Sequence, residues 1–557
     1  MALVCEQEMI AELQRAALST PRDPEAWRRL GTALNKAGAG MPAILAWTQV
    51  TRLDPDDGCG WLGLAKARER LGEIDGAIEA YNRAIELCPD QGAWRLAAAR
   101  AMPVIMESNK QIARFRAAMA ATLTEIIRCP PRRFEFHAGI MTNNFYTAYH
   151  NEDDRPLQEL LARAHLAVAP GLAWEAPHCH APLPSAHGRR LKLGVVSSHF
   201  HQHSIGKTTI GLVQELDCDR FELTVLRAKQ APDDGLAAAI DAAANRVVVL
   251  PATRDKTRRA IADLGLDILF YADIGMSAST YLLAFARLAP VQCVTWGHPD
   301  TTGIPNLDYF LSSDCAEPQG AQVHYSEELV RLGGATVCYR RPAVPRMLRD
   351  RAYFGLPAEG ALYACPHTIF RLHPDFDAVL GEVLRRDPRG RLVFVNSGEK
   401  HFDTLLLRRF ARTMPDILDR VVMLKGMPYE DFLGLLSLAD CVLDAPNFSG
   451  HNASLDAFAM GVPVVTWADA QFLRGRFTLG MYKTMSMDEC IARSKDNYVS
   501  IALRLAHDAD FRRFVCQAIA ARSPLLFDDR TVVRAHEDFW QDAVERRRVE
   551  GFPARSA

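Results

Sequence analysis

A repeat with a period of 34 residues near the N-terminus constrains the fold of this chain most strongly. Trp27 and Trp61 stand 34 residues apart, and the same spacing relates Pro55 to Pro89. It also relates Leu30 to Leu64, Gly38 to Gly72, Ile44 to Ile78, Trp47 to Tyr81 and Leu53 to Leu87. This period is typical of tetratricopeptide repeats, helical hairpins that bury their apolar faces by stacking. The alternative is an amphipathic bundle whose matching positions coincide by chance. We predict a repeat domain over residues 1–100 whose concave surface holds a protein segment.

The pattern changes twice after the repeats. Helical periodicity continues to about residue 170, and the stretch from Pro170 to Gly188 is rich in Pro, Ala and His without any periodicity. We therefore predict a helical bridge and a linker over residues 101–188.

Beyond Arg190, short apolar runs alternate with helical stretches in two series. The first series covers residues 191–196, 222–226, 246–250, 267–271, 291–296 and 309–311, and the second covers 361–365, 392–395, 421–424, 441–443 and 463–466. Such alternation predicts parallel sheets with helices on both faces. We expect two doubly wound lobes at residues 189–345 and 346–530, with ligands bound beyond the carboxyl ends of the strands. Residues 531–557 contain an amphipathic helical pattern.

Composition excludes several classes of protein. The 557 residues suffice for about three or four domains, and 48% of them are hydrophobic, which excludes a disordered chain. With 65 basic and 67 acidic residues the net charge is −2, so a dedicated nucleic-acid binder is not expected. No stretch of about 20 apolar residues indicates a membrane span, and the N-terminus does not resemble a secretory signal. The 13 cysteines never form CxxC, which favours reduced thiols and a cytoplasmic protein.

The loop after the run 441–443 carries the strongest chemical signal. Small and polar residues from Asn447 to Ala453 lead into a helical pattern. The free N–H groups at a helix start suit a diphosphate, and Asp456 would lie about one turn inside, where a carboxylate can accept two ribose hydroxyl protons. The alternative is an ordinary strand-to-helix connection with its N-cap at Ser449 or Asn452.

Two other loops follow predicted strands. Gly297 to Gly303 reads GHPDTTG, which suits either the mouth of a pocket or a tight turn capped by Thr. Ser197 to Ser204 contains three histidines at a spacing of two. These could bind zinc, but they lack the regular paired spacing of structural zinc sites, so a histidine that acts as acid, base or substrate orienter is favoured. No dinucleotide or Walker motif is present.

Three motifs together resemble a known family. They are SSHFHQHS at 197–204, RLAPVQCVTWGHPDTTGIPNLDYFLSS at 287–313 and SGHNASLDAFAMGVPVVT at 449–466. The chain resembles the O-linked N-acetylglucosamine transferases, including the bacterial SPINDLY-like forms, in which tetratricopeptide repeats precede a GT-B glycosyltransferase of two Rossmann-like lobes. In this fold class the C-terminal helix crosses back to the first lobe. The resemblance implies inverting transfer of N-acetylglucosamine or a related hexose, from a UDP-linked donor to Ser or Thr of a protein, without a metal or other cofactor.

The resemblance also assigns roles by motif position. His203 would be the catalytic histidine near the reaction centre. The donor would be bound by His298, Pro299 and Thr301 along the pocket, by Arg371 at a phosphate-binding position, by Phe432 on the uracil, by His451, Asn452 and Ala453 around the diphosphate, by Asp456 on the ribose and by Arg476 as the residue that closes the site.

Two departures from the family pattern leave alternatives open. Arg371 replaces the usual lysine, and Asn452 and Ala453 replace two threonines. An arginine is not equivalent to an ammonium in a tight pocket. The alternatives are an N-glycosyltransferase that modifies Asn of an adhesin-like protein, and a repeat scaffold with weakened catalysis. Flagellin or another surface protein is an expected acceptor by family analogy alone, and the oligomeric state is open.

Overall fold

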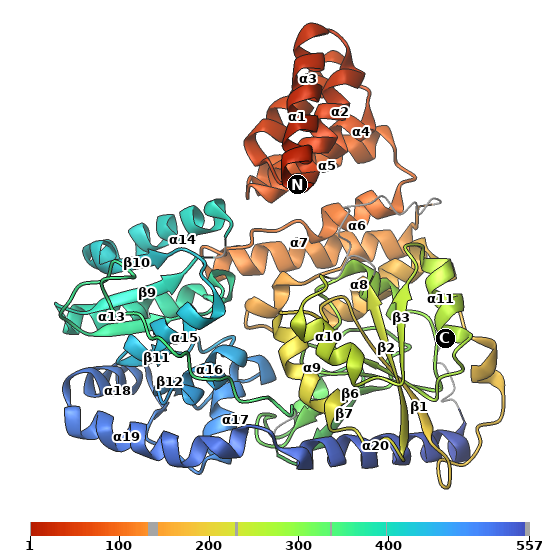
Figure 1. The fold of residues 1–557 in the computed structure, drawn as a ribbon. Coiled ribbons are helices and arrows are strands. Elements are labelled where there is room, and N and C mark those ends of the chain that lie inside the picture. The colour runs from red at the N-terminus through yellow and green to blue at the C-terminus, as the bar shows by residue number, and fades with distance from the viewer. Residues whose placement is uncertain (1, 132–142, 229–231, 335–336, 397, 552–557) are drawn as a thin grey trace. The chain divides into compact units, whose positions relative to one another are not determined.

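A computed structural model describes residues 2–131, 143–228, 232–334, 337–396 and 398–551 (Figure 1). Part of the predicted bridge, residues 132–142, lies outside the described residues. The contacts divide the chain into two compact units. One contains the chain up to Asn144 together with Leu160–Gly171, and the other contains Phe145–Glu159 and Leu172 onward.

The first unit is built from antiparallel helical hairpins, drawn in red and orange in Figure 1. Its helices are α1 (Ala2–Ser19), α2 (Pro24–Lys36), α3 (Gly40–Leu53), α4 (Gly58–Arg70), α5 (Ile74–Leu87), α6 (Gly92–Arg100) and α7 (Asn109–Arg128). α2 packs on α3 and α4 packs on α5, so each 34-residue period corresponds to one hairpin. The repeat fold is therefore present as predicted.

The hydrogen bonds repeat with the same period. The indole of Trp27 donates to the Pro21 carbonyl at 3.1 Å, and the indole of Trp61 donates to the Pro55 carbonyl at 2.8 Å. Asp57 caps α4 by accepting from the Cys59 N–H, as Asp23 does for α2. Equivalent residues therefore make equivalent contacts in successive hairpins.

Trp47 of α3 explains why glycines recur in the neighbouring helices. Its indole is buried, and a Cβ atom added to Gly31 or Gly63 would lie only 2.7 or 2.4 Å from the ring. The ring thus fills space that any side chain at these two positions would need.

The second unit contains two parallel sheets. The first has the order β3-β2-β1-β4-β5-β6-β7, with β1 (Leu191–Ser197), β2 (Phe221–Ala228), β3 (Arg246–Leu250), β4 (Ile268–Tyr271), β5 (Val291–Val294), β6 (Tyr309–Ser313) and β7 (Glu328–Leu332). The second has the order β10-β9-β8-β11-β12-β13, with β8 (Leu362–Cys365), β9 (Arg391–Val395), β10 (Val421–Leu424), β11 (Cys441–Leu443), β12 (Val464–Trp467) and β13 (Ile491–Ala492).

Helices connect the strands of both sheets, as a doubly wound fold requires. In the first lobe these are α9 (Ser204–Gln214), α10 (Gly235–Ala242), α11 (Arg254–Ala262) and α12 (Ala278–Ala284). In the second they are α13 (Asp377–Arg386), α14 (Lys400–Thr413), α15 (Tyr429–Leu438), α16 (Asn452–Ala459) and α17 (Phe477–Thr484), and the last strand is followed by α18 (Lys495–His507) and α19 (Ala509–Arg522). The remaining helices are α8 (Arg155–Val168), which contributes to both units, and α20 (Arg530–Glu550).

The C-terminal helix α20 packs against the first sheet (Figure 1). Trp540 of this helix is fully buried, with its ring centroid 5.8 Å from that of Phe221 and 5.5 Å from that of Phe270. The last helix in sequence thus completes the core of the first lobe.

The predicted linker is held against the first lobe by backbone contacts. The Ala176 N–H donates to the Arg287 carbonyl at 2.8 Å, and Ala176 and Cys179 are buried. The lack of periodicity reflects short 3-10 turns at Pro170–Leu172 and Pro177–His180.

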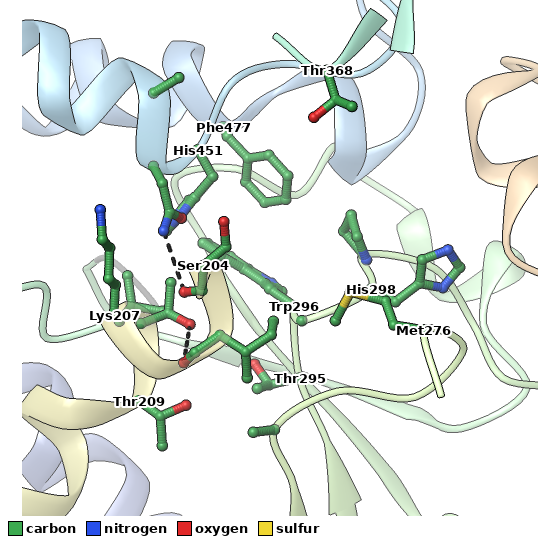
Figure 2. Close-up of a pocket in the computed structure, with 18 of the residues that line it drawn as sticks. Ser204, Lys207, Thr209, Met276, Thr295, Trp296, His298, Thr368, His451 and Phe477 are labelled. Carbon is green, nitrogen blue, oxygen red and sulfur yellow. Dashed lines mark hydrogen bonds between the residues drawn. The ribbon is translucent and has the colours of Figure 1, made fainter. Parts of the chain in front are cut away.

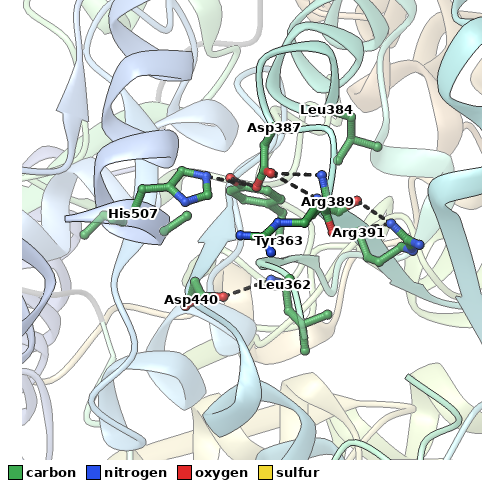
Figure 3. A network of polar contacts seen from close by, with 12 residues as sticks. Leu362, Tyr363, Leu384, Asp387, Arg389, Arg391, Asp440 and His507 are labelled. Atoms are coloured by element: carbon green, nitrogen blue, oxygen red, sulfur yellow. Dashed lines mark hydrogen bonds and ion pairs between the residues drawn. The ribbon is translucent and has the colours of Figure 1, made fainter. Parts of the chain in front are cut away.

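A polar network fixes the amino ends of β8 and β9 (Figure 3). Asp387 accepts hydrogen bonds from the Tyr363 hydroxyl at 2.9 Å and from the Gly390 N–H at 3.1 Å, and His507 lies 3.1 Å from the same carboxylate. Because this network lies at the amino ends of the strands, it stabilises the sheet at the edge opposite the one where ligands are expected.

Gly211 gives a first testable prediction. A Cβ atom at this position of α9 would lie 1.8 Å from the Cys338 carbonyl oxygen, so Gly211→Ala should lower the free energy of unfolding by roughly 3 kcal/mol. Urea denaturation measures the change. Gly235→Ala is the matched control, because nothing lies within 4 Å of its added Cβ atom. Equal stability of the two variants would contradict this close approach.

Two further observations bear on the expectations from composition. Among the helices of the described residues, none is long and apolar enough to cross a membrane. The cysteines whose side chains are described are all free thiols.

Candidate functional site

A cavity of about 280 Å³ opens at the carboxyl ends of the strands of both lobes. Its walls come from the segments that follow β1, β4, β5, β8 and β11, and Figure 2 shows Ser204, His298, Thr368 and His451 around it. The structure brings together eight of the predicted site residues here: His298, Pro299, Arg371, Phe432, His451, Asn452, Ala453 and Asp456. It does not bring His203, Thr301 or Arg476 to the wall of this cavity.

Asp444, at the end of β11, holds the loop that leads to α16. Its carboxylate accepts from the Ser449 hydroxyl at 2.6 Å, from the Gly450 N–H at 2.7 Å and from the Thr466 hydroxyl at 2.7 Å. The His367 Nε2 atom lies 3.4 Å from the same carboxylate. These contacts fix the loop before the helix begins.

The start of α16 presents unpaired backbone donors to the cavity. Leu455 makes the first intrahelical bond, from its N–H to the His451 carbonyl at 3.0 Å. The N–H groups of Asn452 and Ala453 precede that bond and have no partner within the helix. Both residues line the cavity, so this end of the helix can bind an anion.

Asp456 lies one turn further along α16 and is 3% exposed. One carboxylate oxygen accepts from the Tyr429 hydroxyl at 2.7 Å and lies 3.4 Å from the Tyr339 hydroxyl. Burial raises the pKa of Asp456, while the Lys207 ammonium and the two tyrosine hydroxyls oppose the shift. The second oxygen is thus the natural acceptor for a ligand hydroxyl.

Two cations face the cavity from different lobes. Arg371 follows β8 and lies over the Phe448 ring, with 4.6 Å from its guanidinium carbon to the ring centroid, and its Nε atom is buried without a hydrogen-bond partner. Lys207 of α9 places its ammonium 3.2 Å from the centroid of the Tyr429 ring on α15. The positive charge that a diphosphate needs is therefore present, although the net charge of the chain is −2.

Two histidines of the cavity are neutral at pH 7. Burial lowers the pKa of His298 to about 4 and that of His451 to about 4. The His298 Nε2 atom lies 3.2 Å from the Phe145 carbonyl oxygen, and its ring lies 5.0 Å from the Phe145 ring. The His451 Nδ1 atom lies 3.0 Å from the Asn452 amide oxygen. Both rings are positioned by neighbours rather than by solvent.

His203 lies one residue before the cavity wall and caps α9. Its Nδ1 atom accepts from the Ile205 N–H at 3.2 Å, and its ring stacks on that of His199 at 4.5 Å. Burial lowers the pKa of His203 to about 4. Among the described residues, no group of three or more His, Cys, Asp or Glu side chains is placed to hold a metal ion.

Thr301 and Arg476, the other two predicted residues outside the cavity wall, form hydrogen bonds with other parts of the chain. The Thr301 hydroxyl donates to Glu327 at 2.7 Å and is buried. The Arg476 guanidinium donates to the carbonyls of Ala316 at 2.7 Å and Ala470 at 2.8 Å. Arg476 thereby holds the loop after β12, and its neighbour Phe477 lines the cavity.

Sequence reasoning missed several residues of the site, above all Lys207, Tyr429 and Asp444. Lys207 follows His203 by four residues in a helical pattern, and this spacing places the two on one face of the helix. That signal could have identified Lys207. No local signal links Tyr429 to Asp456.

Asp273, just beyond β4, gives a prediction about pH. Its carboxylate accepts from the Ser197 hydroxyl, and the Ser197 hydroxyl oxygen accepts from the His199 N–H at 2.9 Å. Burial raises the pKa of Asp273 from 3.8 to about 6. Between pH 3.8 and about 6, the folded chain therefore keeps a proton that the unfolded chain has lost. The free energy of unfolding consequently falls as pH rises through this window.

Asp273→Asn should remove this dependence, because an amide oxygen still accepts from Ser197 and carries no charge. We expect a flatter stability profile between these pKa values, and at most roughly 3 kcal/mol of added stability at pH 8. Urea denaturation across this pH range measures the effect. An unchanged slope in the variant would assign the pH dependence to other groups.

Comparisons with known proteins agree with this architecture. The model of glycosyl transferase family 41 matches residues 171–338 and 340–534, which together form more than half of the chain, and a tetratricopeptide repeat model matches residues 60–101. The solved structure of an O-GlcNAc transferase mutant from Thermobaculum terrenum superposes with a TM-score of 0.70 and 22% identity, over 98% of this chain and 95% of that one. At this identity the match shows the fold.

Curated relatives match parts of the chain. A probable UDP-N-acetylglucosamine--peptide N-acetylglucosaminyltransferase SPINDLY of Solanum lycopersicum is 27% identical over 254 residues, 43% of this chain and 26% of the relative. A UDP-glucose:protein N-beta-glucosyltransferase of Actinobacillus pleuropneumoniae is 25% identical over 262 residues, 45% of this chain and 41% of the relative. The matched part thus spans about a quarter of the SPINDLY protein. The family model, the repeats and the two-lobed fold agree with the resemblance in the motifs, and the chain belongs to glycosyl transferase family 41.

Proposed function

We propose that this protein is a glycosyltransferase that moves a sugar from a nucleotide sugar to a side chain of a protein acceptor. The observation that carries the proposal is the cavity between the lobes. The start of α16, the Asp456 carboxylate and the Arg371 guanidinium all line this cavity. The carboxylate is chemically matched to ribose hydroxyls, and the helix start and the guanidinium are matched to a diphosphate.

The proposed donor is UDP-N-acetylglucosamine or a related UDP-hexose. In the transfer an acceptor oxygen forms a bond to the anomeric carbon from the face opposite the diphosphate, the bond from that carbon to the phosphate oxygen breaks, and the configuration inverts. The negative charge that develops on the diphosphate is met by the N–H groups of Asn452 and Ala453 and by Arg371. Phe432, which lines the same cavity, is proposed to stack on the uracil.

Two neutral imidazoles are proposed to orient the acceptor hydroxyl and take its proton. His298 lines the cavity, and His203 lies beside Ser204, which lines it too. Single-turnover rates of His203→Ala and His298→Ala separate these roles: a large loss for one variant alone assigns the proton transfer to that residue.

We further propose that the reaction needs no metal ion, because α16, Arg371 and Lys207 supply positive charge toward the diphosphate. Turnover in the presence of a chelator tests this statement. A loss of activity that Mg²⁺ or Mn²⁺ restores would contradict it.

The acceptor is proposed to be a cytoplasmic protein segment held by the repeats, with flagellin or another surface protein as the first candidates before export. A second candidate function is transfer to Asn, favoured by the similarity to the relative named as a protein N-beta-glucosyltransferase. Peptide mapping of the modified acceptor by mass spectrometry separates Ser or Thr from Asn.

The first experiment is a thermal-shift screen of nucleoside diphosphates and nucleotide sugars. A ligand at 100 times its dissociation constant stabilises the folded state by about 2.7 kcal/mol. We expect uridine diphosphate compounds to stabilise the protein most. We also expect the protein to hydrolyse the sugar donor that it binds, at a slow rate. Stabilisation without any turnover would favour the scaffold with weakened catalysis, and no stabilisation by any nucleotide would contradict the proposal.

A further inference from the structure

A second cavity, of about 310 Å³, lies in the second lobe and shares no lining residue with the first. Pro446 and Asn447 form part of its wall, while Phe448 and His451 on the same loop line the first cavity. One loop, the loop that Asp444 holds in place, therefore contributes to the walls of both cavities. The volume of the second cavity is at the lower end of the range for small-molecule sites, ~300–1,000 Å³.

The cavity has an aromatic wall that is held rigidly. Trp467, at the end of β12, is partly exposed and lines the cavity together with Phe376. The centroid of the buried Tyr498 ring lies 6.2 Å from that of Trp467 and 5.9 Å from that of Phe376. The Tyr498 hydroxyl donates to the Asp444 carbonyl at 2.9 Å. Since the core supports these rings, Trp467 offers a flat apolar surface that does not have to be ordered on binding.

The remaining wall mixes donors and acceptors of hydrogen bonds. The lining includes carboxylates, carboxamides and one ammonium group, from Asp375, Asp469, Asn151, Asn447, Gln471 and Lys495. Asn151 holds a positive φ of 56°, a conformation that asparagine tolerates better than most residues. The side chains of Asp469, Gln471 and Lys495 are exposed, so they are free to meet a ligand from solvent.

This combination matches one chemical class better than others. A flat aromatic ring packs against the apolar C–H face of a pyranose, and each sugar hydroxyl both donates and accepts hydrogen bonds. A cationic ligand would be attracted by the two carboxylates but would leave Lys495 and the carboxamide N–H groups without acceptors, and an anion would be repelled by Asp375 and Asp469. A neutral polyhydroxylated ligand uses every group of the wall.

We propose that this cavity is a second binding site, specific for a neutral hexopyranose unit. Because one loop contributes to both this cavity and the donor cavity, the site suits a sugar that is already attached to the acceptor or product. Recognition of an acceptor or product that already carries a sugar rests on the proposed function, whereas binding of the sugar itself does not.

The test is saturation-transfer NMR with the full chain and two probes, the methyl β-glycoside of N-acetylglucosamine and the cation Nα-acetyl-lysine amide. Both are measured with excess UDP to occupy the donor cavity, and again without it. We expect the glycoside to bind in the millimolar range under both conditions and the cation not to bind. Trp467→Ala should weaken glycoside binding at least about tenfold, because the stacking surface is lost.

Lys495→Met and Gln471→Ala are exposed changes that keep the test valid if Trp467→Ala fails to fold. Each should weaken glycoside binding by about threefold to tenfold through loss of one hydrogen bond. A site for cations would instead bind the lysine probe more tightly in Lys495→Met. The proposal is overturned if only the cation binds, if neither probe binds, or if all three variants bind the glycoside unchanged. None of these outcomes depends on turnover, so failure here is distinguishable from failure of the proposed transfer reaction.

Discussion

Asp456→Ala is expected to lower the affinity for both uridine and UDP by about 100-fold or more. The carboxylate is proposed to accept two ribose hydroxyls, and hydrogen bonds to a charged group contribute ~1.5–3 kcal/mol each. The substitution also leaves the hydroxyls of Tyr429 and Tyr339 without their shared acceptor. Isothermal titration calorimetry with each ligand measures the loss.

Asp456→Asn is the matched control, because it keeps the shape and one acceptor oxygen while it removes the charge. We expect an intermediate affinity. In the unchanged protein, nucleotide affinity should fall as pH drops through the raised pKa of Asp456, since the protonated carboxyl is a weaker acceptor. The asparagine variant should lose that pH dependence. Nucleotide affinity that is unchanged in Asp456→Ala would place the ribose elsewhere.

Arg371→Met is expected to reduce the rate of sugar transfer by roughly 100- to 1,000-fold, the size seen when one group that stabilises developing charge is removed. UDP affinity should fall too, but uridine affinity should not, because uridine lacks the diphosphate. This contrast separates Arg371 from Asp456, whose loss weakens both ligands. Uridine and UDP titrations, together with single-turnover rates, provide the measurements.

Arg371→Lys tests whether the guanidinium is needed or only its charge. Arg371 lies over the Phe448 ring and is buried, and a lysine there keeps the charge but loses the planar contact. We expect UDP affinity between those of the unchanged protein and Arg371→Met. If Arg371→Met transfers sugar at the normal rate, the diphosphate is neutralised by other groups.

Most of the fold that could be predicted was predicted from patterns within single helices and strands. The 34-residue spacing indicates helices with one buried face, and the apolar runs indicate strands that are buried on both faces, such as β4 and β5. β7 was missed because it is an edge strand with the charged residues Glu328 and Arg331 in a five-residue run. β13 was missed because it has only two residues, too few to show any period.

The site was predictable where its chemistry is local, as in the loop that leads to α16. Thr301 and Arg476 belong to the same kind of motif, yet they bond to Glu327 and to backbone carbonyls. A sequence cannot tell a polar residue that faces a cavity from one that a distant segment satisfies. The contacts of Asp456 with Tyr429 and of Lys207 with the Tyr429 ring escaped for the same reason, because the partners lie on separate helices.

The contacts between the lobes have a thermodynamic consequence. The Asn452 amide donates to the Ser204 carbonyl at 3.2 Å, and Lys207 lies on Tyr429, so α9 meets α15 and α16 beside the cavity. A ligand bound between surfaces that these contacts join covers the cavity lining and not the large apolar area of a closing hinge. Its heat-capacity change on binding should therefore be small and negative, set by the cavity lining.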